Sequence, residues 1–208
     1  MTLDGSRLYL VAGERLAAGR LVDLVPELAG AGVDVVQLRD KEMEAGPMLH
    51  AAQGLALMCR SVGVPFFVND RPDVAHAAGA NGVHLGQDDL PPRAARALAP
   101  EALVGWSTHS VAQIDEVLTW ETRPDYVAVG PVFATPTKPG RPPTGVELLR
   151  YAATAIPPEL PWFAIGGIDA ANLPEVLDAG ARRIVVVRAI ADAPDPAEAA
   201  ARLRAALD

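Results

Sequence analysis

The chain has 208 residues, of which 50% are hydrophobic and 21% charged, and its formal net charge is -8. That length can bury one sizeable core, and no Ser/Gly-rich or like-charge segment divides it, so we expect a single domain over residues 1–208. The acid excess argues against a nucleic-acid partner, since such proteins normally present a basic face. Apolar runs of about five to eight residues are too short to span a bilayer, and a basic-then-apolar leader is missing, so we expect a cytoplasmic protein with no membrane partner.

Eight segments, in chain order, have the apolar and β-branched runs typical of strands buried on both faces. These are residues 8–12, 33–39, 65–69, 82–86, 103–107, 125–132, 162–167 and 184–189. Helices are predicted to follow them at 20–31, 46–62, 72–79, 91–99, 110–120, 144–155, 170–179 and 196–207. Eight β/α units in one chain of this size predict an α/β protein, a single (β/α)8 TIM barrel. An open doubly wound sheet is the alternative, and it would require one element to be miscounted.

Several helix boundaries carry specific signals. Ser110 with Gln113 has the spacing of a capping box, and Asp195-Pro196 reads as an N-cap followed by proline at the first helical position. Asp169 is expected to start the seventh helix. These signals support the assignment of helices between the strands.

Short polar clusters follow five of the predicted strands. They are Gln37-Leu38-Arg39-Asp40-Lys41, Asn69-Asp70-Arg71, Gly86-Gln87-Asp88-Asp89, Gly105-Trp106-Ser107-Thr108 and Thr135-Pro136-Thr137-Lys138. In a parallel barrel all strand ends open onto one mouth, where such enzymes build their active sites. We therefore expect the five clusters to meet in space.

Two carboxylates follow neighbouring strands in this set. Asp70 ends the third predicted strand and Asp89 follows the fourth. Mg²⁺ accepts one or two protein carboxylates and completes its shell with water and substrate phosphates. The alternative is that each aspartate caps the helix that begins near Pro72 or Pro91. A magnesium site and a pair of helix caps are both open on this evidence.

Cationic groups lie in the same clusters. Arg39 and Lys41 follow the second strand and Lys138 follows the sixth, and both residue types bind phosphate oxygens well. Solvated surface pairs are the alternative reading of each one. A second anion site is suggested by Gly166-Gly167 after the seventh strand and by Arg188, which is expected to end the eighth.

Other features have simpler interpretations. The proline-rich loop over residues 135–144 resembles an active-site lid, with a rigid surface loop as the alternative. Cys59 lies in an apolar helical stretch and is predicted to be a buried structural thiol. His84 and His109 are placed near the barrel interior and mouth, His50 and His76 on helices, and structural roles are favoured for all four. No zinc-binding spacing is present.

Taken together, six segments in register resemble the thiamine-phosphate synthase family, from about residue 8 to residue 191. They are residues 37–41, 69–71, 82–89, 105–107, 130–138 and 164–168. The resemblance implies a TIM-barrel transferase that uses Mg²⁺. It joins 4-amino-2-methyl-5-(diphosphooxymethyl)pyrimidine to 4-methyl-5-(2-phosphooxyethyl)thiazole and yields thiamine phosphate and pyrophosphate. Both partners are phosphorylated small molecules, and oligomerisation is left open.

The family's site residues carry over position by position. The pyrimidine pyrophosphate site corresponds to Gln37, Leu38, Arg39, Asp40, Lys41, Asn69, Ser107 and Lys138, and the metal ligands to Asp70 and Asp89. The thiazole phosphate site corresponds to Thr135, Pro136, Thr137, Gly167, Val187 and Arg188. The catalytic groups implied are Arg39, Lys41, Ser107 and Lys138.

One position departs from the family. Arg188 stands where relatives commonly have a small hydroxyl residue after valine, and our hypothesis is that its guanidinium binds the same phosphate. Two alternative functions remain: a thiazole tautomerase of the same fold, and a non-catalytic ligand-binding regulator. Retention of the pyrophosphate and metal residues argues against the tautomerase, which has no need of them.

Overall fold

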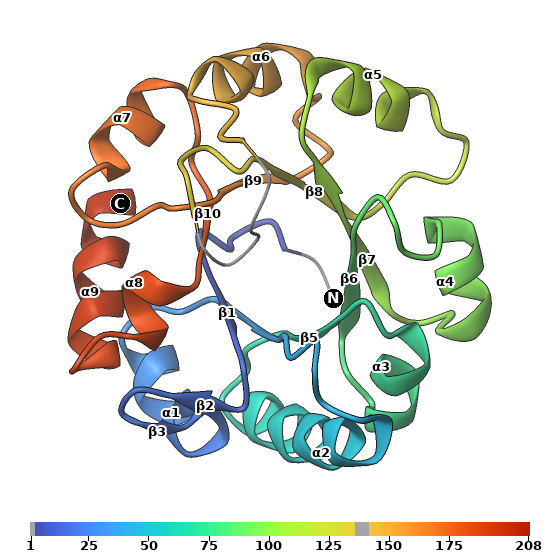
Figure 1. Ribbon diagram of the computed structural model, residues 1–208, viewed down its shortest axis with the longest axis vertical. Coiled ribbons are helices and arrows are strands. Elements are labelled where there is room, and N and C mark those ends of the chain that lie inside the picture. Colours follow the sequence, from blue (N-terminus) through green and yellow to red (C-terminus); the bar gives the residue numbers. More distant parts are fainter. Residues whose placement is uncertain (1–2, 136–141) are drawn as a thin grey trace.

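Eight parallel strands close into a barrel in the computed structural model, which describes residues 3–135 and 142–208 (Figure 1). The barrel strands are β1 (Leu8–Ala12), β4 (Val35–Leu38), β5 (Phe66–Asn69), β6 (Gly82–Leu85), β7 (Leu103–Thr108), β8 (Tyr126–Val129), β9 (Trp162–Ile165) and β10 (Ile184–Val186). Each strand pairs with the next along the chain, and β1 closes the ring by pairing with both β4 and β10. The predicted barrel is confirmed, and the open-sheet alternative is wrong.

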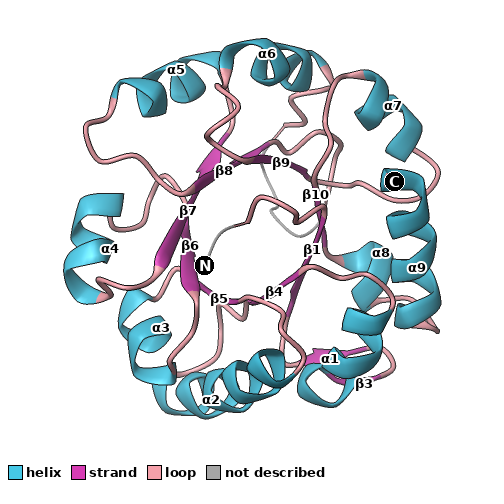
Figure 2. Ribbon diagram, turned by 180° about the vertical axis from the view of Figure 1, so that it is seen from behind, coloured by secondary structure: helices cyan, strands magenta, loops and turns pink. Residues whose placement is uncertain are grey.

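Helices surround this ring on its outside (Figure 2). The eight predicted helices are α1 (Leu21–Gly30), α2 (Ala45–Ser61), α3 (Pro72–Ala78), α4 (Pro92–Leu98), α5 (Val111–Thr119), α6 (Glu147–Ala155), α7 (Leu173–Asp178) and α9 (Pro196–Leu207). Three short elements were not predicted: the hairpin of β2 (Arg15–Leu16) and β3 (Gly19–Arg20), and the four-residue helix α8 (Arg188–Ala191). Within the described ranges, no helix combines the length and apolar character needed to cross a membrane.

The helix caps behave largely as the sequence predicts. The Ser110 hydroxyl accepts from the Gln113 N–H at 3.3 Å, and the Asp195 carboxylate accepts from the Glu198 N–H at 2.8 Å. Asp169 differs: its carboxylate accepts from the N–H groups of Ala171 and Asn172, which closes a turn. That turn delays the seventh helix, so α7 begins at Leu173 and not at residue 170.

Aromatic rings fill the barrel interior. Tyr9, Phe67, Tyr126 and Phe163 are fully buried there, with ring centroids 5.5–5.9 Å apart. Gly82 on β6 provides the space for one of these rings, because a Cβ at this position would overlap the ring of Phe67. Gly105 does the same for the ring of Tyr126 on the neighbouring strand. The interior is thus a packed core, which leaves only the strand ends for chemistry.

A second core lies between the strands and the helices. It contains Cys59, which is buried and free, and burial raises the pKa of its thiol to about 12. Because the thiolate is the reactive form, this cysteine is inert in the folded protein. The prediction of a structural thiol is confirmed.

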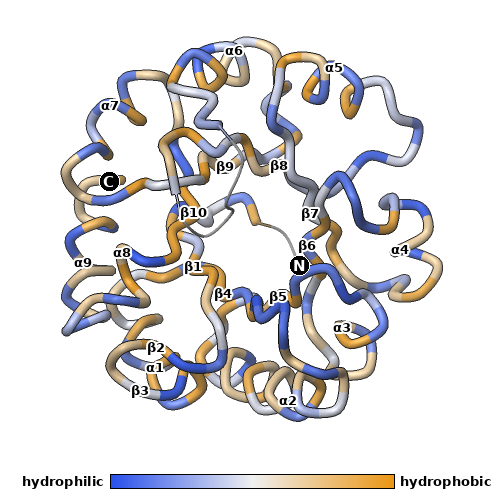
Figure 3. The backbone as a smooth tube through the Cα atoms, viewed as in Figure 1, coloured by the Kyte–Doolittle hydropathy of each residue, from blue (hydrophilic) through white to orange (hydrophobic). Residues whose placement is uncertain are grey.

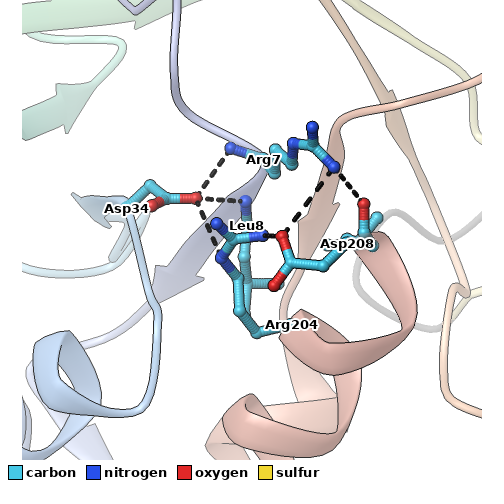
Figure 4. Close-up of polar contacts among 6 residues, drawn as sticks. Arg7, Leu8, Asp34, Arg204 and Asp208 are labelled. Atoms are coloured by element: carbon cyan, nitrogen blue, oxygen red, sulfur yellow. Dashed lines mark hydrogen bonds and ion pairs between the residues drawn. The ribbon is translucent and has the colours of Figure 1, made fainter.

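The last helix is tied to the first strand by a polar cluster at the amino ends of the strands (Figure 4). The Asp34 carboxylate accepts from the N–H groups of Arg7 and Leu8 at 2.7 and 2.9 Å. It also lies 4.0 Å from the Arg204 guanidinium, and Arg204 pairs in turn with Asp208. These contacts join the start of β1 to the end of α9 at the face opposite the strand ends that carry the polar clusters.

Candidate active site

A cavity of about 320 Å³ opens at the carboxyl ends of the strands. Hydrophilic segments directly follow β4 and β5 (Figure 3), and Arg39, which follows β4, lines the cavity. Side chains or backbone from all eight barrel strands and their loops line it. Those used below are Tyr9, Gln37, Arg39, Asn69, His84, Ser107, His109, Tyr126, Thr135, Gly166, Gly167, Val187 and Arg188. Residues of four of the five predicted strand-end clusters thus meet at this cavity, with Thr135 as the one described residue of the last cluster. The remaining cluster, residues 86–89, adjoins the site through Asp89, which lies next to Asp70.

Asp70 and Asp89 come together at the edge of this cavity, next to Lys41. The Lys41 ammonium lies 3.1 Å from the Asp70 carboxylate, and the Asp89 carboxylate accepts from the Gly86 N–H at 2.7 Å. Burial raises the pKa of Asp89, the adjoining Asp70 carboxyl raises it further, and the Gly86 N–H and Lys41 oppose the rise. Two adjoining carboxylates form a place where a cation is favoured.

Neither aspartate caps a helix. The N-cap residues of α3 and α4 are Arg71 and Pro91, and neither helix has a side-chain cap. The helix-cap alternative is therefore wrong. Asp70 also adopts φ 64°, in the left-handed region, where it is the one non-glycine residue among those described. Such strained backbone concentrates at functional sites.

A metal held here would have few protein ligands. Over the described residues no group of three or more His, Cys, Asp or Glu side chains is placed to hold a metal ion. This excludes an all-protein zinc-type cage from that part of the chain. A pair of carboxylate ligands is the donor set that suits Mg²⁺ when a substrate phosphate and water complete the shell.

Gln37 and Ser107 stand at the two ends of a chain of buried hydrogen bonds. The Gln37 amide donates to the Tyr9 hydroxyl at 2.7 Å, and the Tyr9 and Tyr126 hydroxyls lie 3.0 Å apart. His84 connects to Tyr126 at 2.8 Å through Nδ1 and to Ser107 at 2.9 Å through Nε2. Burial raises the pKa of both tyrosines well above its usual value, so both phenols stay protonated.

The sequence interpretation missed both tyrosines. They occupy inward positions on apolar strands, where an aromatic residue is normally read as core. The inward orientation predicted for His84 is confirmed, and its structural hydrogen bonds are present. A sequence signal for these hydrogen bonds does exist: an inward polar residue near a strand end, opposite an inward tyrosine.

The opposite side of the cavity is formed by backbone. Gly167 has φ 67°, and a Cβ there would lie 2.8 Å from the Phe133 Cβ, so a side chain does not fit. The Asn172 amide donates to the Gly167 carbonyl at 2.8 Å and holds this turn in place. A glycine turn that lines a cavity lets the backbone approach an anion closely.

Arg188 differs from its predicted position. Strand β10 ends at Val186, and Arg188 is the first residue of α8, so the prediction that it ends the eighth strand is wrong. The strand stops because Val187 leaves the extended region, with φ -120° and ψ -89°. The exposed Arg188 still lines the cavity, as do Val187 and Thr135. Pro136, Thr137, Lys138 and most of the predicted lid lie outside the described residues.

Two residues of the first cluster face away from the cavity lining. Leu38 is buried in the core between strands and helices. The Asp40 carboxylate accepts from the N–H groups of Glu42 and Met43, both at 3.1 Å, and so shapes the turn after β4. The cluster thus alternates, with Gln37 and Arg39 lining the cavity.

The fold and the cavity define a TIM-barrel protein with cationic side chains and a pair of carboxylates at its strand ends. This arrangement is typical of an enzyme that acts on a phosphorylated substrate. The family model described as thiamine monophosphate synthase matches residues 8–190. The chain belongs to this family, and the predicted resemblance and enzyme class are confirmed.

Individual relatives agree with this assignment. A thiamine-phosphate synthase of Acidothermus cellulolyticus is 52% identical, with 99% of this chain and 97% of the relative aligned. One from Thermus thermophilus is also 52% identical, over 95% of each chain. The solved thiamine phosphate pyrophosphorylase of Pyrococcus furiosus has a TM-score of 0.85 at 33% identity, covering 97% of this chain and 95% of its own. A 3-hexulose-6-phosphate synthase, at 24% identity and TM-score 0.66, shares the fold.

Proposed function

We propose that this chain joins 4-amino-2-methyl-5-(diphosphooxymethyl)pyrimidine to 4-methyl-5-(2-phosphooxyethyl)thiazole in the cytoplasm, releasing thiamine phosphate and pyrophosphate. The observation that carries the proposal is the cluster of Lys41, Asp70 and Asp89 beside a cavity lined by Arg39 and Ser107. A diphosphate needs such a set of charges in a protein of net charge -8. A tautomerase acting on the thiazole alone would have no use for it.

Asp70 and Asp89 are proposed to hold Mg²⁺. These residues fit a magnesium ion because their carboxylates adjoin one another, with Lys41 beside Asp70. Neither carboxylate caps a helix. When bound, the ion supplies positive charge that stabilises the departing diphosphate oxygens. Asp70 and Asp89 would hold the ion, and Lys41 adds a positive charge of its own.

The proposed reaction breaks the bond between the pyrimidine methylene carbon and the diphosphate oxygen, and the electron pair leaves with pyrophosphate. The thiazole nitrogen then donates its lone pair to the methylene carbon and forms the new C–N bond. Arg39, Lys41 and Lys138 stabilise the charge on the leaving group, and the Asn69 amide and the Ser107 hydroxyl donate to its oxygens. The protein contributes binding and electrostatics and needs no nucleophile of its own.

The thiazole phosphate is assigned to the opposite side, where Gly167, Val187 and Arg188 line the cavity together with Thr135. Replacing Arg188 by serine restores the small hydroxyl common in the family. We expect the KM for thiazole phosphate to rise about tenfold, because a charge-assisted bond to phosphate is lost, while the KM for the pyrimidine diphosphate stays constant. Steady-state kinetics with each substrate varied in turn measures both values.

Arg182→Ser is the matched control for Arg188. Arg182 donates to the Leu177 and Ala181 carbonyls at the amino end of the same β/α unit, away from the cavity. Its replacement should leave both KM values unchanged. An unaltered thiazole phosphate KM in Arg188→Ser would remove Arg188 from the proposed site.

The proposed activity is tested by supplying both substrates with Mg²⁺ and following pyrophosphate release and thiamine phosphate formation. Asp70→Ala and Lys138→Ala should abolish turnover while the folded protein persists. Absence of turnover in the unmodified protein, with both variants binding the substrates normally, would reject the synthase assignment.

A further inference from the structure

The hydrogen-bonded chain below the cavity is a continuous path between two substrate-facing residues. It runs from Gln37 through Tyr9, Tyr126 and His84 to Ser107, with successive distances of 2.7, 3.0, 2.8 and 2.9 Å. All five residues are at most 8% exposed, so bulk water does not compete for these bonds. They come from strands β1, β4, β6, β7 and β8, so the path crosses the barrel interior.

Every member of this path can both donate and accept one hydrogen bond. The hydrogens can therefore all point toward Ser107 or all point toward Gln37. In the first direction the Gln37 amide N–H donates to Tyr9, and the Ser107 hydroxyl keeps its hydrogen for the cavity. In the second direction Ser107 donates inward to His84 and presents only lone pairs to the cavity. Because a buried polar group without a partner is costly, mixed arrangements are disfavoured.

An anionic oxygen at Ser107 selects between these directions, since it can only accept a hydrogen bond. It requires the first direction, which is the one with the Gln37 N–H donating to Tyr9. The remaining terminal atom of Gln37 is then its carbonyl oxygen, an acceptor. An acceptor binds the amino group of an aminopyrimidine and rejects the carbonyl of the corresponding 4-oxo ring.

We propose that Tyr9 and Tyr126 are positioning residues in a relay through which diphosphate binding at Ser107 fixes the orientation of the Gln37 amide and so enforces selection of a 4-aminopyrimidine. The inference rests on the proposed function, which supplies a diphosphate at one end and an aminopyrimidine at the other. It adds a coupling between the two ends. Neither tyrosine needs to touch the substrate.

Tyr126→Phe tests the relay because it removes the central hydroxyl and keeps the ring that fills the barrel. The ratio of kcat/KM for the 4-amino diphosphate to that for its 4-oxo analogue should fall about tenfold, since the Gln37 amide is then free to turn. Tyr9→Phe should give the same result. Combining Ser107→Ala with Tyr126→Phe should lower the ratio no further than either change alone, because both interrupt one path.

Tyr151→Phe is the matched control. Its hydroxyl also donates a hydrogen bond, to Asp115, but on the outer surface between α6 and α5. The ratio should be unchanged in this variant. If Tyr126→Phe and Tyr9→Phe turn over both substrates with the unmodified ratio, the relay is rejected while the synthase activity stands.

A second measurement does not depend on turnover and is read from the unmodified protein. The chain has four glutamines, so the side-chain amide resonance of Gln37 can be assigned in ¹⁵N-labelled protein from its loss in Gln37→Glu. Saturating pyrophosphate with Mg²⁺ should shift and sharpen this resonance, as one amide orientation is selected. An unchanged Gln37 signal with pyrophosphate bound overturns the relay, whatever the outcome of the synthase assay.

Discussion

Asp70→Asn is expected to lower kcat/KM for pyrophosphate release by about 100- to 1,000-fold, the usual cost of removing one preorganised group that stabilises a leaving charge. Asparagine is the sharpest replacement, because it tolerates the left-handed φ of 64° that Asp70 adopts and keeps the size of the side chain. What it removes is one negative charge between Lys41 and Asp89. The Mg²⁺ concentration required for half-maximal rate should rise in parallel, and a titration of activity against Mg²⁺ measures both effects.

The thermal stability of Asp70→Asn should rise or stay the same while its activity falls. Without a bound cation, the Asp70 and Asp89 carboxylates repel one another. Removing one of the two charges therefore removes a repulsion that destabilises the folded protein. A melting temperature equal to or above that of the unmodified protein would therefore accompany the loss of activity. This pairing distinguishes a ligand from a structural carboxylate, whose removal lowers both.

Asp73→Asn is the control for this variant. Asp73 lies three residues further along, in the first turn of α3, and its carboxylate pairs with Arg71 at the surface. Exposed pairs of this kind contribute little, so activity and its Mg²⁺ dependence should stay within about twofold. Equal losses in the Asp70 and Asp73 variants would show that the region matters for folding and not for the ion.

The barrel could be predicted because its signal repeats. Eight apolar runs, each followed by a helical segment, match the closed barrel without a miscounted element, whereas an open doubly wound sheet would need one. The elements that escaped prediction are those too short to show a period: the two-residue strands β2 and β3 and the four-residue helix α8. The wrong prediction for Arg188 has the same cause. Because the apolar run continues through Val185-Val186-Val187, the sequence predicts a longer strand than β10, which ends at Val186.

The strand-end residues of the site could be predicted from the sequence, whereas the buried hydrogen bonds beneath them could not. Positions such as Arg39, Lys41 and Asp70 follow strands directly, so the common mouth of a parallel barrel brings them together. The relay is different, because its bonds join residues far apart in the sequence: Tyr9 and Tyr126 are separated by 117 positions. A strand pattern shows that both side chains face inward but not that their hydroxyls meet. That depends on register and on the tilt of the strands.

Gly82→Ala is expected to destabilise the protein by about 3 kcal/mol or more, the upper range for overpacking a core. The new Cβ would overlap the ring of Phe67 and lie 2.6 Å from the backbone carbonyl oxygen of Leu103. For a chain of this length such a loss corresponds to a melting temperature lower by about 6–12 °C. Thermal unfolding followed by circular dichroism measures it.

Gly54→Ala is the matched control, the same chemical change in the exposed middle of α2. Its nearest neighbour is the Val22 side chain at 3.9 Å, an ordinary contact, so the higher helix propensity of alanine should stabilise by up to about 1 kcal/mol. The two alanine variants should therefore shift the melting temperature in opposite directions. Equal shifts in melting temperature for Gly82→Ala and Gly54→Ala would show that the barrel interior can accommodate a methyl group beside Phe67, which contradicts the prediction.

Gly105→Ala separates two sources of the expected strain. A Cβ at Gly105 meets only the ring of Tyr126 among its three nearest atoms, whereas one at Gly82 also meets backbone. A side chain can be trimmed and a strand backbone cannot, so Tyr126→Leu should restore part of the stability lost in Gly105→Ala. Phe67→Leu should restore less of the loss in Gly82→Ala, because the Leu103 carbonyl stays in place. Similar recovery in both pairs would locate the strain in the rings alone and would count against a backbone contribution at β6 and β7.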